Sequence, residues 1–235
     1  MESSISSFME TRHLTTLRRV ATALGPRSYV VGGCLRDLML DRKVNDVDIA
    51  VDGGTEALSR RLAGECGGTF FWLDQERGHS RVVIKGGGEI VTLDFAPLRG
   101  EDILADLALR DFTINALAIP LTGGQELIDP LGGEADIRAK VVRRCCESVF
   151  RDDPLRLVRA FRFAATLGFG IEAETLAAIP GHGILLANVA GERIRDELFR
   201  ILQVPGAESF VRSMGDAGLL EVLFGLPPSR ISSAV

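Results

Sequence analysis

Apolar and polar positions follow two different periods, and these divide the chain into two parts. From Phe8 to about Leu24 apolar residues recur at helical spacing, and Gly25-Pro26 ends the predicted helix. A second helix is predicted over residues 55–66, between two glycine pairs. Short apolar runs bounded by glycine or polar turns predict strands at residues 29–31, 46–51, 69–73, 80–85 and 89–95. From Arg151 onward the periodicity is helical and predicts no strand.

This order of elements predicts an α+β protein, with a mixed sheet covered by helices on one side and then an all-helical domain. We place the boundary after Arg138, which gives domains at 1–138 and 139–235. The segment 129–137 contains a Pro-Leu-Gly-Gly turn and then a short predicted helix, and it closes the first domain.

Composition places the chain among ordinary globular proteins. Of its 235 residues 46% are hydrophobic and 25% charged, and no apolar run approaches the roughly 20 residues of a membrane span. The N-terminus lacks the basic start and apolar stretch of a signal peptide, so we expect a cytoplasmic protein without a membrane partner. The four cysteines and three histidines lack the spacing of a zinc site or a catalytic histidine cluster, and we expect reduced thiols.

Candidate chemistry is concentrated between residues 29 and 51. Gly32-Gly33 follows a short strand and precedes a predicted helix, an arrangement that lets the backbone approach an anion closely. Asp46 and Asp48 lie on one face of the next strand, where a divalent cation such as Mg²⁺ would relieve their repulsion. Alone, either feature could be an ordinary turn or a solvated strand. Together they predict two-metal nucleotidyl transfer.

The charge of the chain is unevenly distributed. The net charge of −5 argues against a nucleic-acid partner, because proteins that bind nucleic acids are usually basic. Between Val141 and Gly170, however, there are six arginines and only three acidic residues. A nucleic-acid partner is therefore compatible with this segment.

The spacing Gly32-Gly33-x-x-Arg36-Asp37, followed by Asp46-x-Asp48, resembles the signature of the DNA-polymerase-beta-like nucleotidyltransferases. Four further motifs follow in order as far as about Leu202, and the five together are similar to those of the bacterial tRNA nucleotidyltransferase and poly(A) polymerase family. The resemblance implies a nucleotidyltransferase head at 1–138 and a helical neck, which selects nucleotides and binds RNA, at 139–235. Body and tail domains of the family are expected to be absent, whether the chain is a fragment or a short member.

The resemblance also implies roles in the head. Asp46 and Asp48 would hold the metals, and the residues expected to bind the nucleotide are Gly32, Gly33, Arg36, Asp37, Arg110, Asp111 and Asn115. Leu109 stands where the family has a first arginine before Arg110. Asp94 interrupts an apolar strand, and it is expected to be a third catalytic carboxylate; a strand-end aspartate facing water is the alternative.

In the neck, Asp152-Asp153-Pro154 is predicted to start a helix. Asp153, Arg156, Arg159 and Arg162 recur every third residue, which predicts a slanting ridge that could be no more than a solvated helix surface. The resemblance implies instead that Asp153 and Arg156 hydrogen-bond the base of the incoming nucleotide, with Arg159 and Arg162 continuing the pattern. The segment 192–198 is expected to brace this helix.

The function implied by the resemblance is Mg²⁺-dependent addition of CMP, AMP or both, from CTP and ATP, to the 3′ end of tRNA. Poly(A) polymerase is the alternative, although residues 70–78 lack the Gly-Arg-Arg-Phe-type stretch that such members tend to carry. An inactive nucleotide- or RNA-binding module is a further alternative, against which the intact Asp46 and Asp48 argue. The sequence leaves open CCA, CC-only or A-only addition, the class of RNA and the oligomeric state.

Overall fold

The computed structural model describes residues 2–86 and 88–225, and it divides the chain into two compact units. One unit comprises Met1–Arg110 and Ile114–Ile137, and the other comprises Asp111–Thr113 and Arg138–Val235. The α+β class is confirmed, with a mixed sheet in the first unit and mostly helices in the second. The catalytic and nucleotide-selecting roles of these units stay predictions.

The first unit is built on a six-stranded sheet in the order β3-β4-β5-β2-β1-β6. Its strands are β1 (Ser28–Val31), β2 (Asp46–Val51), β3 (Thr69–Asp74), β4 (His79–Gly86), β5 (Glu89–Pro97) and β6 (Ala118–Pro120). Only β2 and β5 pair in parallel, and the other neighbours are antiparallel. Five strands agree with the sequence prediction, whereas β6 was not predicted, because three residues are too few for a periodic signal.

The helices of this unit are α1 (Glu2–Met9), α2 (Arg12–Leu24), α3 (Gly33–Met39), α4 (Thr55–Cys66), α5 (Ile103–Ala108) and the start of α6 (Gly133–Ala139), with the last two residues of a 3-10 turn at Thr113–Asn115. The helix predicted from Phe8 to Leu24 is confirmed from Arg12 to its end before Gly25, but its predicted start is wrong. Thr11 has extended backbone angles, and its hydroxyl donates to the carbonyl oxygen of Phe8 at 2.8 Å, which separates α1 from α2. The prediction for α4 is confirmed at both ends.

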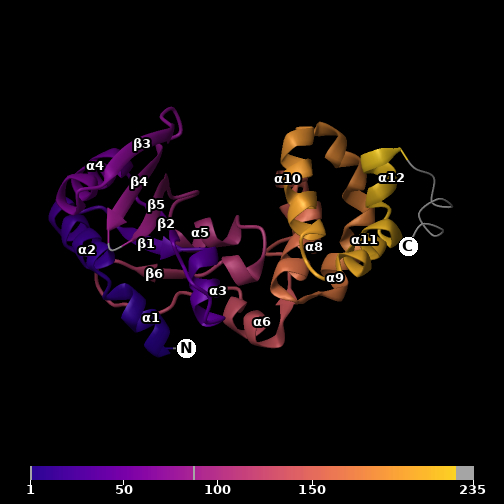
Figure 1. Cartoon of the computed structure of the whole chain (residues 1–235), viewed down its shortest axis with the longest axis horizontal. Coiled ribbons are helices and arrows are strands. Elements are labelled where there is room, and N and C mark those ends of the chain that lie inside the picture. Colours follow the sequence, from indigo (N-terminus) through magenta and orange to yellow (C-terminus); the bar gives the residue numbers. More distant parts are fainter. Residues whose placement is uncertain (1, 87, 226–235) are drawn as a thin grey trace. The chain divides into compact units, whose positions relative to one another are not determined.

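The two faces of the sheet differ in polarity because side chains alternate along each strand. Val47 and Ile49 of β2 and Leu93 and Phe95 of β5 are buried on the face toward α4, and each contributes about 1.5–3 kcal/mol by its removal from water. Figure 1 shows α2 and α4 side by side along the sheet. We call the other face, which carries Asp46, Asp48 and Asp94, the open face.

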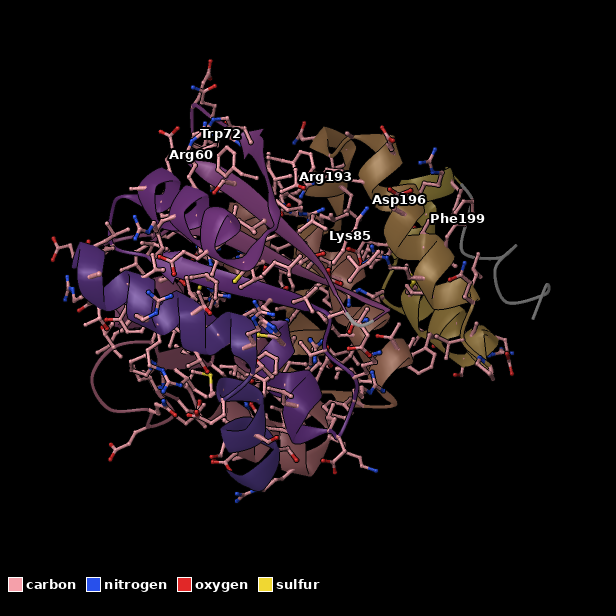
Figure 2. All side chains as sticks on the ribbon, turned by 60° about the vertical axis from the view of Figure 1, so that its left-hand side comes forward. Arg60, Trp72, Lys85, Arg193, Asp196 and Phe199 are labelled. Atoms are coloured by element: carbon pink, nitrogen blue, oxygen red, sulfur yellow. The ribbon has the colours of Figure 1, made fainter. Side chains whose placement is uncertain are left out.

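The edge of the α4-covered face is closed by an aromatic pair. Phe70 and Trp72 of β3 meet edge to face with ring centroids 5.2 Å apart, and the guanidinium of Arg60 lies 4.1 Å from the Phe70 ring. Arg60 and Trp72 can be followed in Figure 2 on α4 and β3. These contacts cover the apolar end of the layer beside the edge strand.

The second unit contains α7 (Val149–Asp152), α8 (Arg156–Leu167), α9 (Ala173–Ala178), a 3-10 helix (Pro180–Asn188), α10 (Gly191–Leu202), α11 (Ala207–Asp216) and α12 (Leu219–Phe224). α8 packs on α10 and α11 (Figure 1). Phe150 and Phe161 are fully buried in its core, and Phe112 meets Phe163 edge to face at 5.7 Å. This contact, the ion pair of Asp111 with Arg159 and the hydrogen bond from the Thr113 amide to the Arg143 carbonyl oxygen join residues 111–113 to this unit. None of the described helices in either unit is long and apolar enough to cross a membrane.

Two local predictions for the second unit are wrong. A strand is present, because β8 (Gly170–Ile171) pairs in parallel with β7 (Val141–Val142), although two residues are too few to show a period. The predicted helix does not start at Asp152, which ends α7, but at Arg156. Asp153 precedes Pro154 and is extended (φ −146°, ψ 102°), as expected where a following proline ring disfavours helical angles.

Candidate active site

The turn between β1 and α3 brings backbone against two charged side chains. Gly32 has φ +83° and ψ −145°, a conformation that glycine adopts without strain and other residues rarely adopt. A Cβ atom there would lie 2.9 Å from Nη1 of Arg110 and 3.4 Å from Oδ2 of Asp48. The Gly32 amide donates to the carbonyl oxygen of Leu117 at 3.0 Å, which fixes the turn. Glycine therefore leaves room for both side chains beside the turn.

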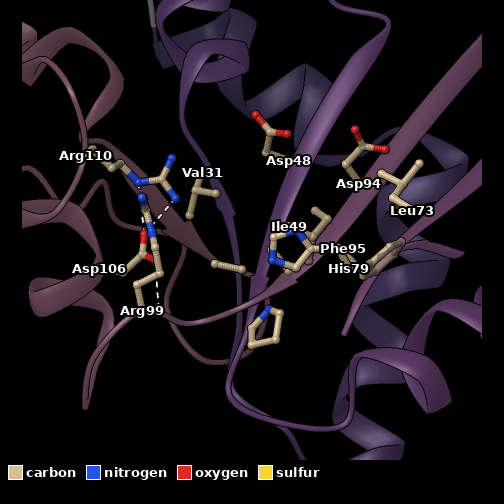
Figure 3. Close-up of a pocket in the computed structure, with 13 residues that line it drawn as sticks. Val31, Asp48, Ile49, Leu73, His79, Asp94, Phe95, Arg99, Asp106 and Arg110 are labelled. Atoms are coloured by element: carbon tan, nitrogen blue, oxygen red, sulfur yellow. Dashed lines mark hydrogen bonds and ion pairs between the residues drawn. The ribbon is translucent and has the colours of Figure 1, made fainter. Parts of the chain in front are cut away.

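Three carboxylates project from the open face of the sheet. Asp46 and Asp48 lie two residues apart on β2, and both are exposed. Asp94 of β5 lies opposite Asp48 in the parallel register, and the two side chains point to the same side (Figure 3). Asp48 reaches solvent, yet reduced hydration in the pocket and the charges of Asp94 and Asp46 raise its pKa, against the opposing effect of Arg110. A divalent cation relieves such a concentration of negative charge.

The donor set fits a hard cation held by few protein ligands. Mg²⁺ is commonly bound by one or two carboxylates together with substrate phosphates, and Asp46 and Asp48 offer that number of carboxylates from one strand face. Among the described residues, no group of three or more His, Cys, Asp or Glu side chains is placed to hold a metal ion. Both oxygens of Asp94 are bound instead to Arg81, which donates from Nε and Nη2 at 2.7 Å each.

A pocket of about 370 Å³ opens beside Asp48 and Asp94. Its opposite side is formed by Arg99 and Arg110, which are grouped about Asp106 (Figure 3). Arg110 donates to Oδ2 of Asp106 from Nε at 3.0 Å and from Nη2 at 2.7 Å, and Arg99 donates to Oδ1 from its amide and from Nε, each at 3.1 Å. The pocket thus has carboxylates on one side and two arginines around a single carboxylate on the other.

Asp106 determines where Arg110 points. Its side chain is 2% exposed, and burial opposes its ionisation, but Arg110 and Arg99 outweigh that effect and hold its pKa below the ordinary value. Asp106 lies in the last turn of α5, and Arg110 follows two residues after the helix ends at Ala108, so the ion pair spans the end of the helix. An ionised Asp106 therefore holds the Arg110 guanidinium in the pocket.

The other predicted residues of the head form a network of their own. Arg36 is 8% exposed, and it donates from Nε and Nη2 to the two oxygens of Asp37 at 3.0 and 2.8 Å, and from Nη1 to Oδ1 of Asn115. A Cβ on Gly33 would lie 3.2 Å from Nη2 of Arg36. These contacts hold α3 against the 3-10 turn at 113–115. The predicted nucleotide contacts of all four residues stay predictions.

In the second unit, the predicted arginine ridge is largely internal. Arg159 donates to Oδ2 of Asp111 at 3.0 and 2.6 Å and to Glu197 at 3.3 Å, and Arg162 donates to the other oxygen of Glu197 at 2.7 Å. Arg162 is buried together with Glu197 and Asp111, so a solvated ridge is wrong at Arg162, whereas Arg159 is partly exposed. Burial lowers the pKa of Arg162 although Glu197 opposes the shift. Glu197 of α10 thereby braces α8.

Asp153 and Arg156 lie at or just before the start of α8, and both are partly exposed, as is Arg159. Oδ2 of Asp153 accepts from Arg193 at 3.0 Å, and Oδ1 accepts from the Leu155 amide at 3.2 Å. Nη1 of Arg156 donates to the Val149 carbonyl oxygen at 3.4 Å. An acceptor and a donor, three residues apart, are thus accessible at the start of α8. Their predicted contact with a base stays a prediction.

Three charged side chains were missed in the sequence: Arg99 and Asp106, which line the pocket, and Arg81, which binds the pocket residue Asp94. The pair Asp106–Arg110 had a local signal, since a spacing of four residues between an acid and an arginine is typical of a helical ion pair, although Arg110 lies just beyond the end of α5. Arg81 had none. Its contact with Asp94 depends on the register of β4 against β5, in which these two residues are direct partners.

Two protein-family models match the chain in sequence. The "Poly A polymerase head domain" matches residues 28–105 and 98–143, and the "Probable RNA and SrmB- binding site of polymerase A" matches residues 168–229. The chain belongs to the poly(A) polymerase and tRNA nucleotidyltransferase family. The resemblance inferred from the motifs is thereby confirmed, and members of this family generally use a divalent metal.

Relatives with assigned activities add to this membership. The chain is 52% identical over 238 residues to the CC-adding tRNA nucleotidyltransferase of Geobacter sulfurreducens, covering 100% of this chain and 55% of that protein. It is 40% identical over 202 residues to the A-adding tRNA nucleotidyltransferase of Deinococcus radiodurans, covering 84% of this chain and 45% of that protein. The chain spans about half the length of these relatives.

Solved structures of the family share the fold. A CCA-adding enzyme in complex with CTP matches with a TM-score of 0.85 at 30% identity, over 95% of this chain and 56% of that one. A tRNA nucleotidyltransferase with a primer tRNA and an incoming ATP analog matches with a TM-score of 0.79 at 31% identity, over 88% of this chain and 62% of that one.

Proposed function

We propose that the chain transfers CMP, AMP or both from CTP and ATP to the 3′ end of tRNA, and that pyrophosphate is released. The observation that carries the proposal is the placement of Asp48 opposite Asp94 on the open face, with Gly32 and Arg110 against Asp48. The relatives with assigned activities support tRNA as the acceptor, and the 52% identity to a CC-adding enzyme over the whole of this chain favours addition of two CMP residues.

Asp46 and Asp48 would hold Mg²⁺ in this proposal, since their oxygens fit that ion. When bound, it would supply positive charge to the triphosphate. Arg110, which Asp106 fixes in place, binds a phosphate oxygen on the far side of the same pocket. Asp94 accepts the proton of the RNA 3′ hydroxyl. The freed oxygen attacks the α-phosphorus of the nucleotide, and the bond to pyrophosphate breaks.

Asp153 and Arg156 are the proposed base-reading pair. A carboxylate that accepts and a guanidinium that donates are complementary to the edge of a base, and both side chains reach solvent. Arg193 holds one oxygen of Asp153 and so limits the orientations available to this carboxylate. Arg159 and Arg162 would support this pair through Glu197 rather than touch the base, because their guanidinium groups are bound to acids inside the unit.

The decisive experiment is to incubate the protein with tRNA that ends before CCA, with CTP, ATP and Mg²⁺, and to sequence the 3′ ends. Products ending in CC, in CCA or in a single added A would each assign one activity within the proposal. A long adenylate tail, with no preference for tRNA, would favour poly(A) polymerase. Absence of any incorporation, for tRNA ending before CCA and for tRNA ending in CC alike, would favour an inactive binding module.

A further inference from the structure

Arg81 of β4 binds Asp94, the carboxylate that β5 carries on the open face. Its Nε and Nη2 each lie 2.7 Å from a different oxygen of Asp94, so the ion pair is bidentate. The two residues are direct partners in the antiparallel register of β4 and β5, and no backbone rearrangement is needed to bring them together. Bidentate pairs of this kind are stronger and more directional than an ordinary surface ion pair.

The pair lies in a single row across the sheet. Arg81, Asp94 and Asp48 occupy successive strands of this row, so Asp94 has a cation on one side and a second carboxylate on the other. The side chains of Arg81 and Asp94 are 41% and 29% exposed, which leaves both able to move into solvent. Asp94 can therefore exchange partners without unfolding any element.

We propose that Arg81 is a positioning residue that competes with the divalent cation, and with the RNA hydroxyl, for Asp94. While Arg81 holds both oxygens of Asp94, neither oxygen is available to coordinate a cation beside Asp48. This agrees with the lack of a three-carboxylate group among the described residues. When Arg81 releases Asp94, the Asp94 carboxylate can bind the cation or the RNA hydroxyl. This inference rests on the proposed function, since it assigns Asp94 to the same site.

The test compares Mn²⁺ binding by wild type and by Arg81→Gln, without nucleotide, by calorimetry or electron paramagnetic resonance. Mn²⁺ serves as the probe because it takes the same oxygen ligands as Mg²⁺. Arg81→Gln should bind Mn²⁺ roughly 3- to 10-fold more tightly, on the scale of a partly exposed bidentate pair. Arg81→Lys should fall between, since an ammonium keeps the charge but lacks the planar fork.

Two controls make the result specific. Lys85→Gln removes one positive charge from the same face of β4, four residues and about 13 Å from Arg81, beyond the screening length at physiological salt, and should leave Mn²⁺ affinity unchanged. In an Asp94→Asn background, Arg81→Gln should produce no gain, because the residue through which it acts is gone. Thermal unfolding monitored by circular dichroism confirms that each variant is folded.

The inference is overturned if folded Arg81→Gln binds Mn²⁺ no more tightly than Lys85→Gln, if the gain persists without the Asp94 carboxylate, or if no variant binds Mn²⁺. A loss of local structure would weaken binding, which is opposite to the expected change. Nucleotide incorporation by the wild type is measured separately. If the wild type incorporates nucleotides but Arg81→Gln leaves the Mn²⁺ affinity unchanged, only this inference is overturned. If the wild type incorporates no nucleotide, the proposed function itself is overturned.

Discussion

Arginine–carboxylate clusters occur in both units, and their surroundings differ. In the first unit, Asp94–Arg81 and Asp106–Arg110 lie around a pocket of about 370 Å³, and both members of the Asp94–Arg81 pair are partly exposed. In the second unit, the cluster of Asp111, Arg159, Glu197 and Arg162 is satisfied internally. Buried ion pairs whose partners satisfy each other are suited to fixing a packing arrangement, and partly exposed ones can exchange a partner for a ligand. The types of residue alone therefore do not distinguish a charged cluster with a chemical role from one that stabilises packing.

The largest effect is expected at Asp48, on the reactive side of this comparison. Asp48→Ala removes the carboxylate at the centre of the open face and should abolish nucleotide incorporation, a loss of about 10³-fold or more where several kcal/mol of metal-assisted stabilisation disappears. The fold should be retained because the side chain is exposed. Single-turnover incorporation at saturating CTP measures this. A folded variant with more than a few per cent of wild-type activity would contradict the metal assignment.

Asp94→Asn should reduce the rate of incorporation by about 10²–10⁴, the usual contribution of a positioned general base. Nucleotide binding should change little, because the amide keeps the shape of the side chain. Parallel measurement of kcat and of the CTP dissociation constant separates the two effects. An unchanged rate would return Asp94 to the role of a strand-end aspartate paired with Arg81.

We call the cluster of Asp111, Arg159, Glu197 and Arg162 the bracing cluster. Substitutions there should act mainly on the free energy of unfolding. Glu197→Ala leaves Arg162 as a buried cation without its carboxylate, and should lower the free energy of unfolding by about 3–5 kcal/mol. Urea unfolding measures the loss. The matched variant is Asp196→Ala on the same helix, whose side chain is 56% exposed and which should change stability by less than about 0.5 kcal/mol. Equal effects of the two variants would remove the distinction between the clusters.

Asp153 and Arg156 should control which nucleotide is added more than how fast it is added. Each lost bidentate base contact should reduce discrimination by about 1–3 kcal/mol, roughly 5- to 150-fold among the four nucleotides. Incorporation of all four triphosphates by Arg156→Ala and by Asp153→Ala measures the ratios. If the rates for all four fall equally and their ratios are preserved, these residues belong with the bracing cluster.

The smallest effects are expected in the pH dependence of stability, with opposite signs on the two sides of the pocket. The pKa of Asp48 in the folded protein is raised above its ordinary value of 3.8, so ionisation of Asp48 destabilises the metal-free fold. The free energy of unfolding is therefore highest below pH 3.8 and falls as the pH rises through the folded pKa. Asp48→Asn should remove this loss of stability.

The pKa of Asp106 is lowered, so the stability that its ionised form gives to the fold is fully present above pH 3.8 and is lost as the pH falls through the folded pKa. Asp106→Asn should therefore destabilise the protein at pH 7 and less so in acid.

The Asp48 effect is read from urea unfolding between about pH 4 and pH 7 without divalent metal, and the Asp106 effect from the same measurement continued down to about pH 2, since acid unfolding mainly reports carboxylates of this kind. The difference between Asp48→Asn and wild type should increase with pH in favour of the variant. A difference of the opposite sign would mean that nearby arginines, not the neighbouring carboxylates and reduced hydration, dominate at Asp48.

Local features of the chain were predictable from the order of residues. Strand alternation places Asp46 and Asp48 on one face whatever lies beside them, and the glycine pairs mark both ends of α4. Motif spacing was sufficient to recognise the family. These signals are short-range, because they depend on backbone periodicity and on the conformational range of single residues.

Long-range pairing required the folded structure. Asp94 lies beside Asp48 because β2 and β5 pair in parallel, and Arg81 reaches Asp94 because β4 has one particular register against β5. The same spacing of three residues gives a partly exposed Arg156 and a buried Arg162, and packing against Glu197 of α10 makes the difference. The position of a residue within a strand or helix determines the face on which its side chain lies. The partner and the exposure of that side chain depend on other segments, which meet it only when the protein folds.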